Sequence, residues 1–405
     1  MRIAIVLFHP LSESLGTMST TFNVIKWLKR LRDDLDVLLL TPFSGQNGEL
    51  NISVYKLSTR IPVFRSELYR LFRFFYWNTP WVIKYVFLDK RTLKRLIKSI
   101  AIGLTRILKK LDVDLLYGVQ EFSVLACIWA KDMARRHDLP VVADIRNYYP
   151  EECVDLGLVR REDSWYQIVR RFCDNAVRLA DIVLVPNEFA RRFLIRRCDL
   201  EQKRVQVLRR GAELFLNENN IPNREPPLLV YSGSFGKIAN LNMLYKSLLI
   251  VSIRRDVKVA ITGRGIYLGK LRELMKHPNV DIKFAWLPSK RAFYSFLSRC
   301  YMGLIPWSKS ISRAFGFPSK LCDYMSVGLP FVATDVGGWT EDLKGKDLGV
   351  FVHDNSLSFA EGILELLNDP DRAVKYALNI IRFVRKEFNW RKSVSELIKL
   401  LRSLI

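Results

Sequence analysis

The chain has 405 residues, 49% of them hydrophobic and 26% charged, a composition ordinary for a folded, enzyme-sized protein. Its length exceeds the usual size of one hydrophobic core, so we expect two domains. No uninterrupted apolar run approaches the roughly 18 residues that span a bilayer, so we expect a soluble or peripheral protein. The net charge of +23 is high and predicts an anionic partner.

The first apolar run, residues 3–8, is too short for a signal peptide and no small-residue cleavage site follows it, so we expect a buried strand there. The six cysteines and four histidines show neither a CxxC pair nor a Cys–His spacing typical of zinc sites. We therefore expect reduced thiols, a cytoplasmic location and no bound metal.

In chain order, the first half alternates short apolar runs with longer amphipathic ones, a pattern typical of βαβ units around a parallel sheet. The predicted strands are residues 3–8, 36–40, 115–117, 141–144, 182–185 and 205–208. Predicted helices include residues 20–31, 122–136, 165–179 and 188–197.

Residues 60–110 break this pattern with 13 basic side chains against two acidic ones, a local charge of +11, interleaved with aromatic residues. Basic and aromatic residues at helical spacing indicate contact with an anionic membrane surface. Two other interpretations stay open: a nucleic-acid site, or a solvated basic face whose aromatics belong to the core.

Residues 217–227 are polar and rich in proline, and we expect a linker there. The strand–helix alternation then restarts, with strands at 229–232, 257–262, 280–284, 302–305, 331–334 and 350–352 and helices from 356 to the end. The predicted fold is α/β, with two doubly wound, Rossmann-like domains at residues 1–216 and 228–385 that face each other across a cleft. Residues 386–405 are predicted to form a helix that packs back toward the first domain.

Glycines follow several predicted strands, where backbone amides can approach a phosphate near a helix N-terminus. The three turns are Gly16-Thr17, the segment with Gly233, Ser234 and Lys237, and Gly263-Arg264. None matches a Walker A motif, and each alone is also explained by a tight turn. Three such turns in one alternating fold favour a phosphate-containing ligand.

The segment FGFPSKLCDYMSVGLPFVATDVGG carries the most specific signal. Pro318 suits a helix start, and the amides of Ser319 and Lys320 would then be free to bind an anion. Asp323 lies one turn further, and its two oxygens suit the two hydroxyls of a ribose. The alternative is a surface ion pair between Lys320 and Asp323 that caps an ordinary helix.

This segment resembles the donor-binding region of retaining glycosyltransferases of family 4 type, which have the GT-B fold and share a P-x-K-x-x-E-Y-M-A-x-G-x-P pattern. ITGRGIYLGKLRELMKHPNVDIKFAW and the later LIP resemble the adjoining part of the family domain. DVDLLYGVQEFSVLACIWAKDMARRHDLPVVADIRNYYPE resembles the acceptor domain. The resemblance covers most of the chain and is weakest at residues 46–110.

The resemblance implies roles for single residues. Asp323 stands where the family has a ribose-binding Glu, and Lys320 matches the motif lysine. Gly16 falls in the loop facing the donor diphosphate, Gly263 and Arg264 fall in the nucleotide pocket, and Gly337-Gly338 forms a turn after a strand. The departures from the pattern are Asp for Glu at 323, Phe315 in place of an earlier acid, Ser234 and Asn240 in place of a paired Arg and Lys, and Gln120 or Glu121 in place of a His.

The resemblance implies transfer of a hexosyl group from a nucleotide diphosphate sugar to a glycan or lipid-linked acceptor, with retention and without a metal or other cofactor. The predicted catalytic residues are Lys320, Lys237, Glu121 and Asp144; the predicted donor site adds Thr17, Gly233, Ser234, Pro318 and Ser319. We expect peripheral contact with the inner face of the cell membrane. A GT-B-fold epimerase and a non-enzymatic nucleic-acid-binding protein are the alternatives.

One further motif, DVD at residues 112–114, could be mistaken for a metal-binding DxD. It directly precedes a predicted buried strand, and we expect a structural role for it.

Overall fold

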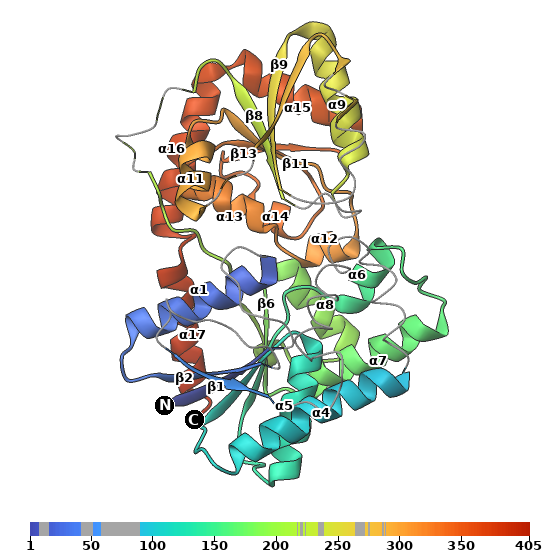
Figure 1. The fold of residues 1–405 in the computed structure, drawn as a ribbon, viewed down its shortest axis with the longest axis vertical. Helices are drawn as coiled ribbons and strands as arrows, with labels where there is room; N and C mark the ends of the chain where they lie inside the picture. The colour runs from blue at the N-terminus through green and yellow to red at the C-terminus, as the bar shows by residue number, and fades with distance from the viewer. Residues whose placement is uncertain are drawn as a thin grey trace. The chain divides into compact units, whose positions relative to one another are not determined.

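The computed structural model describes residues 1–7, 16–41, 52–57, 90–216, 218, 222, 224–233, 239–263, 272–273, 276–285, 287 and 289–405. The chain divides into two compact units. Unit 1 comprises Met1–Arg209 and Trp390–Ile405, and unit 2 comprises Arg210–Asn389. Each unit is a parallel sheet between layers of helices (Figure 1).

The sheet of unit 1 has the strand order β3-β2-β1-β4-β5-β6-β7, and all its neighbouring strands pair in parallel. The order reverses between β1 and β4, as in other doubly wound sheets. The strands are β1 (Arg2–Val6), β2 (Asp36–Thr41), β3 (Ser53–Lys56), β4 (Leu115–Val119), β5 (Val141–Asp144), β6 (Ile182–Val185) and β7 (Val205–Val207). Strand β3 was not predicted, because its sequence, SVYK, is not an apolar run.

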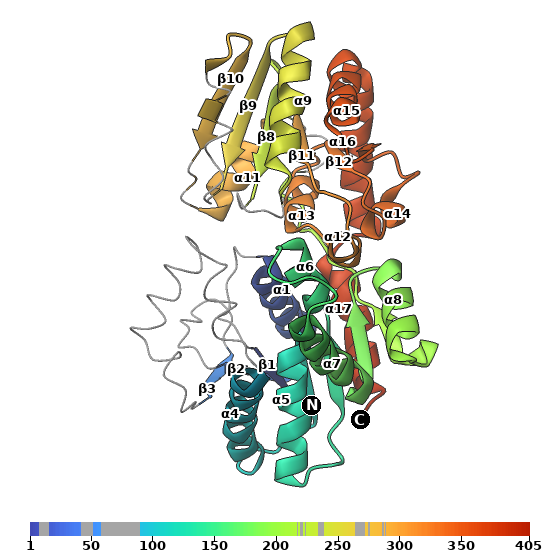
Figure 2. The same ribbon diagram turned by 90° about the vertical axis from the view of Figure 1, so that its right-hand side faces the viewer.

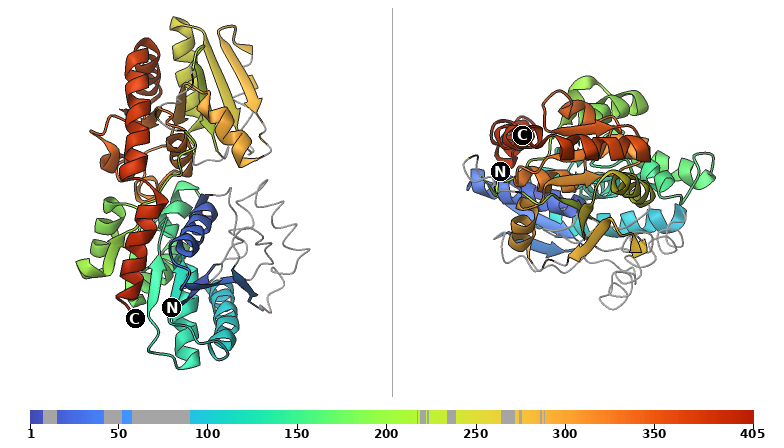
Figure 3. Two further views of the ribbon diagram at one scale, coloured as in Figure 1. Left: turned by 90° about the vertical axis from the view of Figure 1, so that its left-hand side faces the viewer. Right: turned by 90° about the horizontal axis from the view of Figure 1, so that it is seen from above.

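Helices cover both faces of this sheet (Figure 2). Helices α1 (Gly16–Leu31) and α17 (Trp390–Arg402) share one core cluster with the strands. On the other side α5 (Glu121–Ala134) packs between α4 (Lys90–Leu108) and α7 (Ser164–Leu179). Figure 3 shows α17 lying along the sheet, with both chain termini at the same end of unit 1. The last helix of the chain therefore completes the core of the first unit.

Unit 2 has the strand order β10-β9-β8-β11-β12-β13, again parallel throughout. Helices α9 (Leu241–Arg254) and α15 (Ser356–Asn368) share one core cluster with the sheet. Helices α11 (Lys290–Ser298) and α13 (Ser319–Ser326) belong to a second cluster, and α16 (Pro370–Lys386) contacts both α13 and α15. The strands are β8 (Leu228–Ser232), β9 (Val257–Thr262), β10 (Val280–Ala285), β11 (Met302–Ile305), β12 (Phe331–Thr334) and β13 (Gly349–Val352).

The division between the units falls at residue 209, before the predicted linker at 217–227. The described part of that segment belongs to unit 2. The guanidinium of Arg224 donates hydrogen bonds to the carbonyl oxygens of Ser298 (3.1 Å), Gly328 (3.0 Å) and Val327 (2.8 Å). These three hydrogen bonds fix Arg224 to unit 2.

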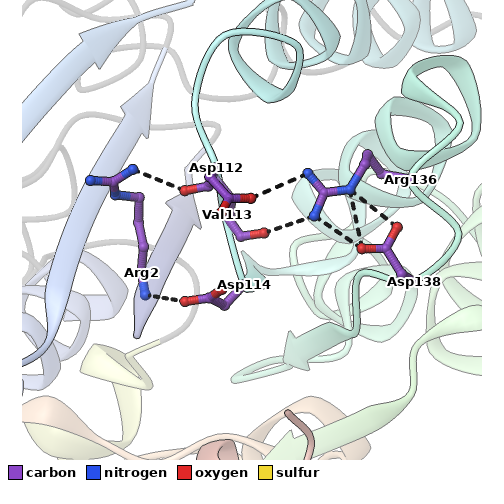
Figure 4. A network of polar contacts seen from close by, with 6 residues as sticks. All are labelled: Arg2, Asp112, Val113, Asp114, Arg136 and Asp138. Atoms are coloured by element: carbon purple, nitrogen blue, oxygen red, sulfur yellow. Dashed lines mark hydrogen bonds and ion pairs between the residues drawn. The ribbon is translucent and has the colours of Figure 1, made fainter.

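The DVD run has the structural role expected of it (Figure 4). The carboxylate of Asp114 accepts the backbone N–H of Arg2 at 2.7 Å, and the guanidinium of Arg2 donates to the Asp112 carbonyl at 3.0 Å. Arg136, just after α5, pairs with Asp138 (3.0 Å) and lies 3.7 Å from the Asp112 carboxylate. Asp112 thus joins the start of β1 to the end of α5, and Asp114 fixes the start of β1.

Candidate active site

Two glycines meet at the carboxyl edge of the unit 2 sheet. Gly233 follows β8 and Gly263 follows β9, with φ values of +138° and +139° that L side chains rarely adopt. The N–H of Gly233 donates to the carbonyl of Thr262 at 2.9 Å. A Cβ on Gly263 would lie 1.8 Å from the carbonyl oxygen of Gly233. Two of the predicted glycine turns therefore pack backbone against backbone.

Helix α13 is fixed against the same edge by Tyr324, a residue that sequence reasoning missed. Its hydroxyl accepts the N–H of Ser232 at 3.1 Å and donates to the carbonyl of Val230 at 3.3 Å. Its ring is so close to β11 that a Cβ on Gly303 would lie 2.4 Å from it. The buried tyrosine thus sets the position of the whole helix.

Lys320 is the central charge of this edge. Its side chain is 9% exposed, and its Nζ lies 4.1 Å from the ring centroid of Tyr231. A Cβ on Gly233 would lie only 2.9 Å from that Nζ. The pKa of Lys320 is lowered to about 7, chiefly by burial; the negative charge of Asp323 opposes this shift and the positive charge of Arg313 adds to it. The surface ion pair considered above is therefore excluded as an account of this buried lysine.

Asp323 makes its hydrogen bond elsewhere. Its Oδ1 accepts the hydroxyl of Tyr294, from α11, at 3.1 Å. Burial raises the pKa of Asp323 to about 6, against the lowering effects of the Tyr294 hydrogen bond and of Lys290, Lys320 and Arg210. This leaves a carboxylate anchored by one oxygen and flanked by positive groups.

The start of α13 adds backbone donors. Pro318 is its N-cap and has no side-chain hydrogen bond to the helix. The first amides of a helix have no acceptor within the helix, so the N–H groups of Ser319 and Lys320 carry the positive end of its dipole. Backbone donors and an ammonium thus lie in the same first turn.

Phe315 and the Gly337-Gly338 turn lie beside this helix. Phe315 ends α12 (Ile311–Phe315) and is fully buried. Gly338 has a φ of +60°, and a Cβ on it would lie 1.9 Å from the carbonyl oxygen of Ala314. The turn therefore packs directly onto α12, and the side chain at 315 points into the protein.

Several predicted donor residues are only partly described. Gly16 is the first residue of α1, which includes Thr17. Ser234, Lys237 and Arg264 lie outside the described residues, so their roles stay predictions.

The carboxyl edge of the unit 1 sheet holds the predicted acceptor residues. Asp144 ends β5, is 4% exposed, and accepts hydrogen bonds from the Tyr117 hydroxyl (2.9 Å) and the Arg146 guanidinium (2.5 Å and 3.0 Å). Arg146 is 3% exposed and also donates to the hydroxyl of Thr21 at 2.7 Å. The ion pair is thus buried and joins β5 to α1.

Glu121 and Gln120 lie at the neighbouring strand end. Glu121 begins α5, is 1% exposed, and accepts the N–H of Tyr149 at 3.1 Å. Burial raises its pKa to about 7. Gln120 has φ 66° and ψ 159°, a conformation otherwise reserved for glycine, and its N–H donates to the Asp144 carbonyl at 2.9 Å. Strained backbone of this kind concentrates at functional sites, and no residue pattern around Gln120 predicts it.

Only the second part of the basic segment 60–110 is described. There α4 exposes Arg91, Lys94, Arg95 and Lys98, while its leucines and isoleucines mostly pack into unit 1. Ile102 is the exception, at 38% exposed. In the described chain no helix is both long and apolar enough to cross a membrane. The apolar side chains of α4 thus belong to the core of unit 1, while the aromatic residues of the basic segment lie within residues 60–89, outside the description, so the three interpretations of that segment stay open.

Comparison with protein families agrees with this geometry. Residues 16–214 match glycosyltransferase family 4, and residues 226–369 match glycosyl transferases group 1. The chain is a glycosyltransferase. This match confirms the family domains expected from the sequence, with glycosyltransferase family 4 covering most of unit 1 and glycosyl transferases group 1 covering most of unit 2.

Solved glycosyltransferases of the GT-B fold share its architecture. Sucrose-phosphate synthase from Thermosynechococcus elongatus is 15% identical, with a TM-score of 0.73 over 100% of this chain and 98% of that one. HepE of Anabaena, solved with UDP-glucose, is 13% identical, with a TM-score of 0.68 over all of both chains. The predicted fold class, two Rossmann-like domains of GT-B type, is confirmed.

One curated relative extends the comparison to function. It is the Campylobacter jejuni N-acetylgalactosamine-N,N'-diacetylbacillosaminyl-diphospho-undecaprenol 4-alpha-N-acetylgalactosaminyltransferase, 22% identical over 260 residues, or 62% of this glycosyltransferase and 68% of the relative. Neither the epimerase nor the nucleic-acid-binding alternative finds support in these comparisons.

Proposed function

We propose that this glycosyltransferase moves a hexosyl group from a nucleotide diphosphate sugar to an acceptor hydroxyl, with retention of the anomeric configuration. One observation carries the proposal: Lys320 is a buried cation beside Gly233 that makes no ion pair among the described residues. An uncompensated buried charge is unfavourable. A bound diphosphate would supply the missing negative charge.

The geometry of α13 also supports binding of the nucleotide that carries the diphosphate. The first amides of the helix and Lys320 would hold the diphosphate, while the free oxygen of Asp323 would accept a ribose hydroxyl. Tyr294 holds the other oxygen in place. A diphosphate next to a ribose is the middle of a nucleotide sugar, and solved relatives of this fold bind UDP and UDP-glucose.

The difficult step is departure of the anionic diphosphate from the anomeric carbon. We assign stabilisation of that charge to Lys320 and the α13 amides, with Lys237 and Arg264 as further predicted cations, rather than to a metal ion. Departure on the face that the acceptor attacks would preserve the configuration and let the leaving phosphate accept the acceptor proton. Anomer analysis of the product by NMR tests retention.

The acceptor residues divide by their contacts. Glu121 is buried, with a pKa raised to about 7, which suits a group that exchanges a proton near neutral pH. Asp144 instead has its carboxylate engaged by Arg146 and Tyr117. We therefore revise the predicted catalytic role of Asp144 to positioning of the loop that follows β5.

We propose a lipid-linked or cell-surface glycan as acceptor, at the inner face of the cell membrane. The Campylobacter relative acts on a diphospho-undecaprenol acceptor. The exposed basic face of α4 would contact anionic headgroups electrostatically, since its apolar face is covered. Salt-sensitive sedimentation with phosphatidylglycerol vesicles tests this; reversal of Lys94 and Lys98 to Glu should abolish it.

Thermal unfolding in a panel of UDP-, GDP- and ADP-sugars tests the donor site. We expect one nucleotide series to stabilise the wild type and Asp323→Ala to lose most of that shift, because ligand binding to the folded state alone raises the transition temperature. Asp256→Ala is the matched control, since Asp256 is an exposed acid of unit 2 away from α13. No shift with any nucleotide sugar at millimolar concentration would refute the proposal.

A further inference from the structure

Helix α8 (Glu188–Cys198) lines a surface cavity of about 460 Å³ that none of the predicted site residues uses. The lining side chains are spaced three and four residues apart, so they form one face of the helix over more than two turns. They are Phe189, Arg192, Phe193, Arg196 and Arg197. Three guanidinium groups and two aromatic rings thus surround one hollow.

The buried residues Asp174 and Tyr148 hold the side chain of Arg197 in place. Its Nε lies 3.5 Å from a carboxylate oxygen of Asp174, which is 5% exposed on α7, and its guanidinium lies 5.9 Å from the ring centroid of Tyr148. One of its terminal nitrogens is buried and has no hydrogen-bond acceptor among the described residues. Arg196, one position before it, is exposed. An oriented guanidinium with an unused donor differs from a freely solvated arginine.

The aromatic part of the face is also ordered. The rings of Phe189 and Phe193 stack at 6.2 Å with an interplanar angle of 17°. Phe193 meets the ring of Tyr148 edge-on at 5.2 Å. The next residue is Tyr149, whose N–H donates to Glu121. Two consecutive tyrosines therefore join the cavity to the acceptor edge of unit 1.

We propose that this cavity is an anion subsite for the acceptor, which binds a phosphate group and packs the adjoining apolar group on the phenylalanine pair. Guanidinium groups bind phosphate through paired hydrogen bonds, and a neighbouring aromatic pair covers hydrocarbon. The inference rests on the proposed function, because it assigns the acceptor of that reaction a phosphate next to an apolar chain.

Binding of geranyl phosphate to the full-length protein, measured by calorimetry with excess UDP present, tests the subsite. We expect the wild type to bind geranyl phosphate more tightly than geraniol or inorganic phosphate. Arg196→Glu should weaken binding by about tenfold or more, because it places a negative charge in the cavity. The control is Arg171→Glu, the same charge reversal at an exposed residue of α7 that does not line the cavity; it should bind within about twofold of the wild type.

Three outcomes would overturn the proposal. Equal weakening in both variants would mean that only overall charge matters, and no weakening in Arg196→Glu would place the ligand elsewhere. Loss of phosphatidylglycerol-vesicle binding in Arg196→Glu, with unchanged binding of geranyl phosphate, would make the face a membrane contact instead. Failure of this subsite is distinguishable from failure of the proposed function, since nucleotide-sugar stabilisation is measured without an acceptor.

Discussion

The carboxyl edges of the two sheets differ in whether their buried charged side chains have ion-pair partners. In unit 2, Lys320 is buried without an ion-pair partner in the described chain, next to Gly233, whose positive φ disfavours a side chain. In unit 1, Asp144 is buried together with Arg146, and the pair also binds Tyr117 and Thr21.

This difference distinguishes a charged residue that can bind a ligand from a charged pair that positions the backbone. A buried charge without a partner reduces stability and is retained where a ligand completes it. A buried pair with all its hydrogen bonds made fixes a loop and depends on both members. Under the proposed function, the carboxyl edge of the unit 1 sheet (the acceptor edge) is organised before any ligand arrives, whereas the carboxyl edge of the unit 2 sheet (the donor edge) needs an anion to complete it.

The largest expected effect is on the stability of unit 1. Arg146→Met should lower the free energy of unfolding by about 3–5 kcal/mol, because it leaves the Asp144 carboxylate buried without its cation. Urea denaturation followed by circular dichroism measures it. The double variant with Asp144→Asn should recover part of the loss, and a loss below about 1 kcal/mol for the single variant would mean that Asp144 is not held by this pair.

Lys320→Met should reduce the rate of transfer strongly and leave the stability almost unchanged, the opposite of what we expect for Arg146→Met. We expect transfer to slow by about 10²–10³-fold, as when one group that stabilises the leaving charge is removed. The free energy of unfolding should stay equal or rise by about 1 kcal/mol, since an apolar side chain of similar length replaces a buried cation. Steady-state kinetics test the predicted loss of rate, and urea denaturation tests the predicted stability. A clearly destabilised variant would make Lys320 a structural residue.

Gly233→Ala tests the contact between backbone and lysine. The new Cβ would lie 2.9 Å from the Lys320 Nζ, so the ammonium must move, and we expect donor affinity to fall by about tenfold. Gly345→Ala is the control: Gly345 also has positive φ, but a Cβ there would meet no atom within 4 Å. Both variants carry backbone strain, and only the first should lose affinity in calorimetry. Equal losses would attribute the effect to strain alone.

The sequence predicted the fold and the helix that begins at Ser319 well, because both depend on local pattern. Alternating apolar runs specify strands and helices, and the proline before Ser319-Lys320 marks the start of α13. The helix does begin at Ser319, directly after that proline.

The contacts that the site residues make with distant parts of the chain could not be predicted from local sequence pattern. Tyr324 belongs to the family pattern quoted above, but the pattern does not name the strand groups that its hydroxyl bonds. Tyr294 reaches the site from α11, and nothing in its own sequence context marks it. The pairing of Asp144 with Arg146 and the conformation of Gln120 depend on neighbouring strands that are distant in sequence. Such long-range contacts require the fold to be known first.

The donor edge should also respond to pH with two opposite slopes. The pKa of Lys320 in the folded protein, about 7, lies below its ordinary value of 10.5. The unfolded chain therefore binds more protons between these values, and stability without ligand should rise with pH across that range. Nucleotide affinity should fall above pH 7, because the diphosphate needs the protonated amine. Lys320→Met should flatten both slopes, as seen by thermal unfolding and calorimetry over a pH series.

The smallest expected effect is that of Tyr294→Phe on nucleotide affinity, and its pH dependence shows whether Tyr294 acts through Asp323 or only stabilises the structure. Tyr294→Phe removes the hydrogen bond that holds the Asp323 carboxylate, and we expect nucleotide affinity at pH 7.5 to fall by about 2–5-fold, the usual contribution of one such bond. That bond lowers the pKa of Asp323, which is about 6 in the folded protein. Without it the pKa rises, so the loss of affinity on acidification should begin at a higher pH. A merely structural tyrosine would weaken binding equally at every pH, and calorimetry from pH 5 to 8 distinguishes the two cases.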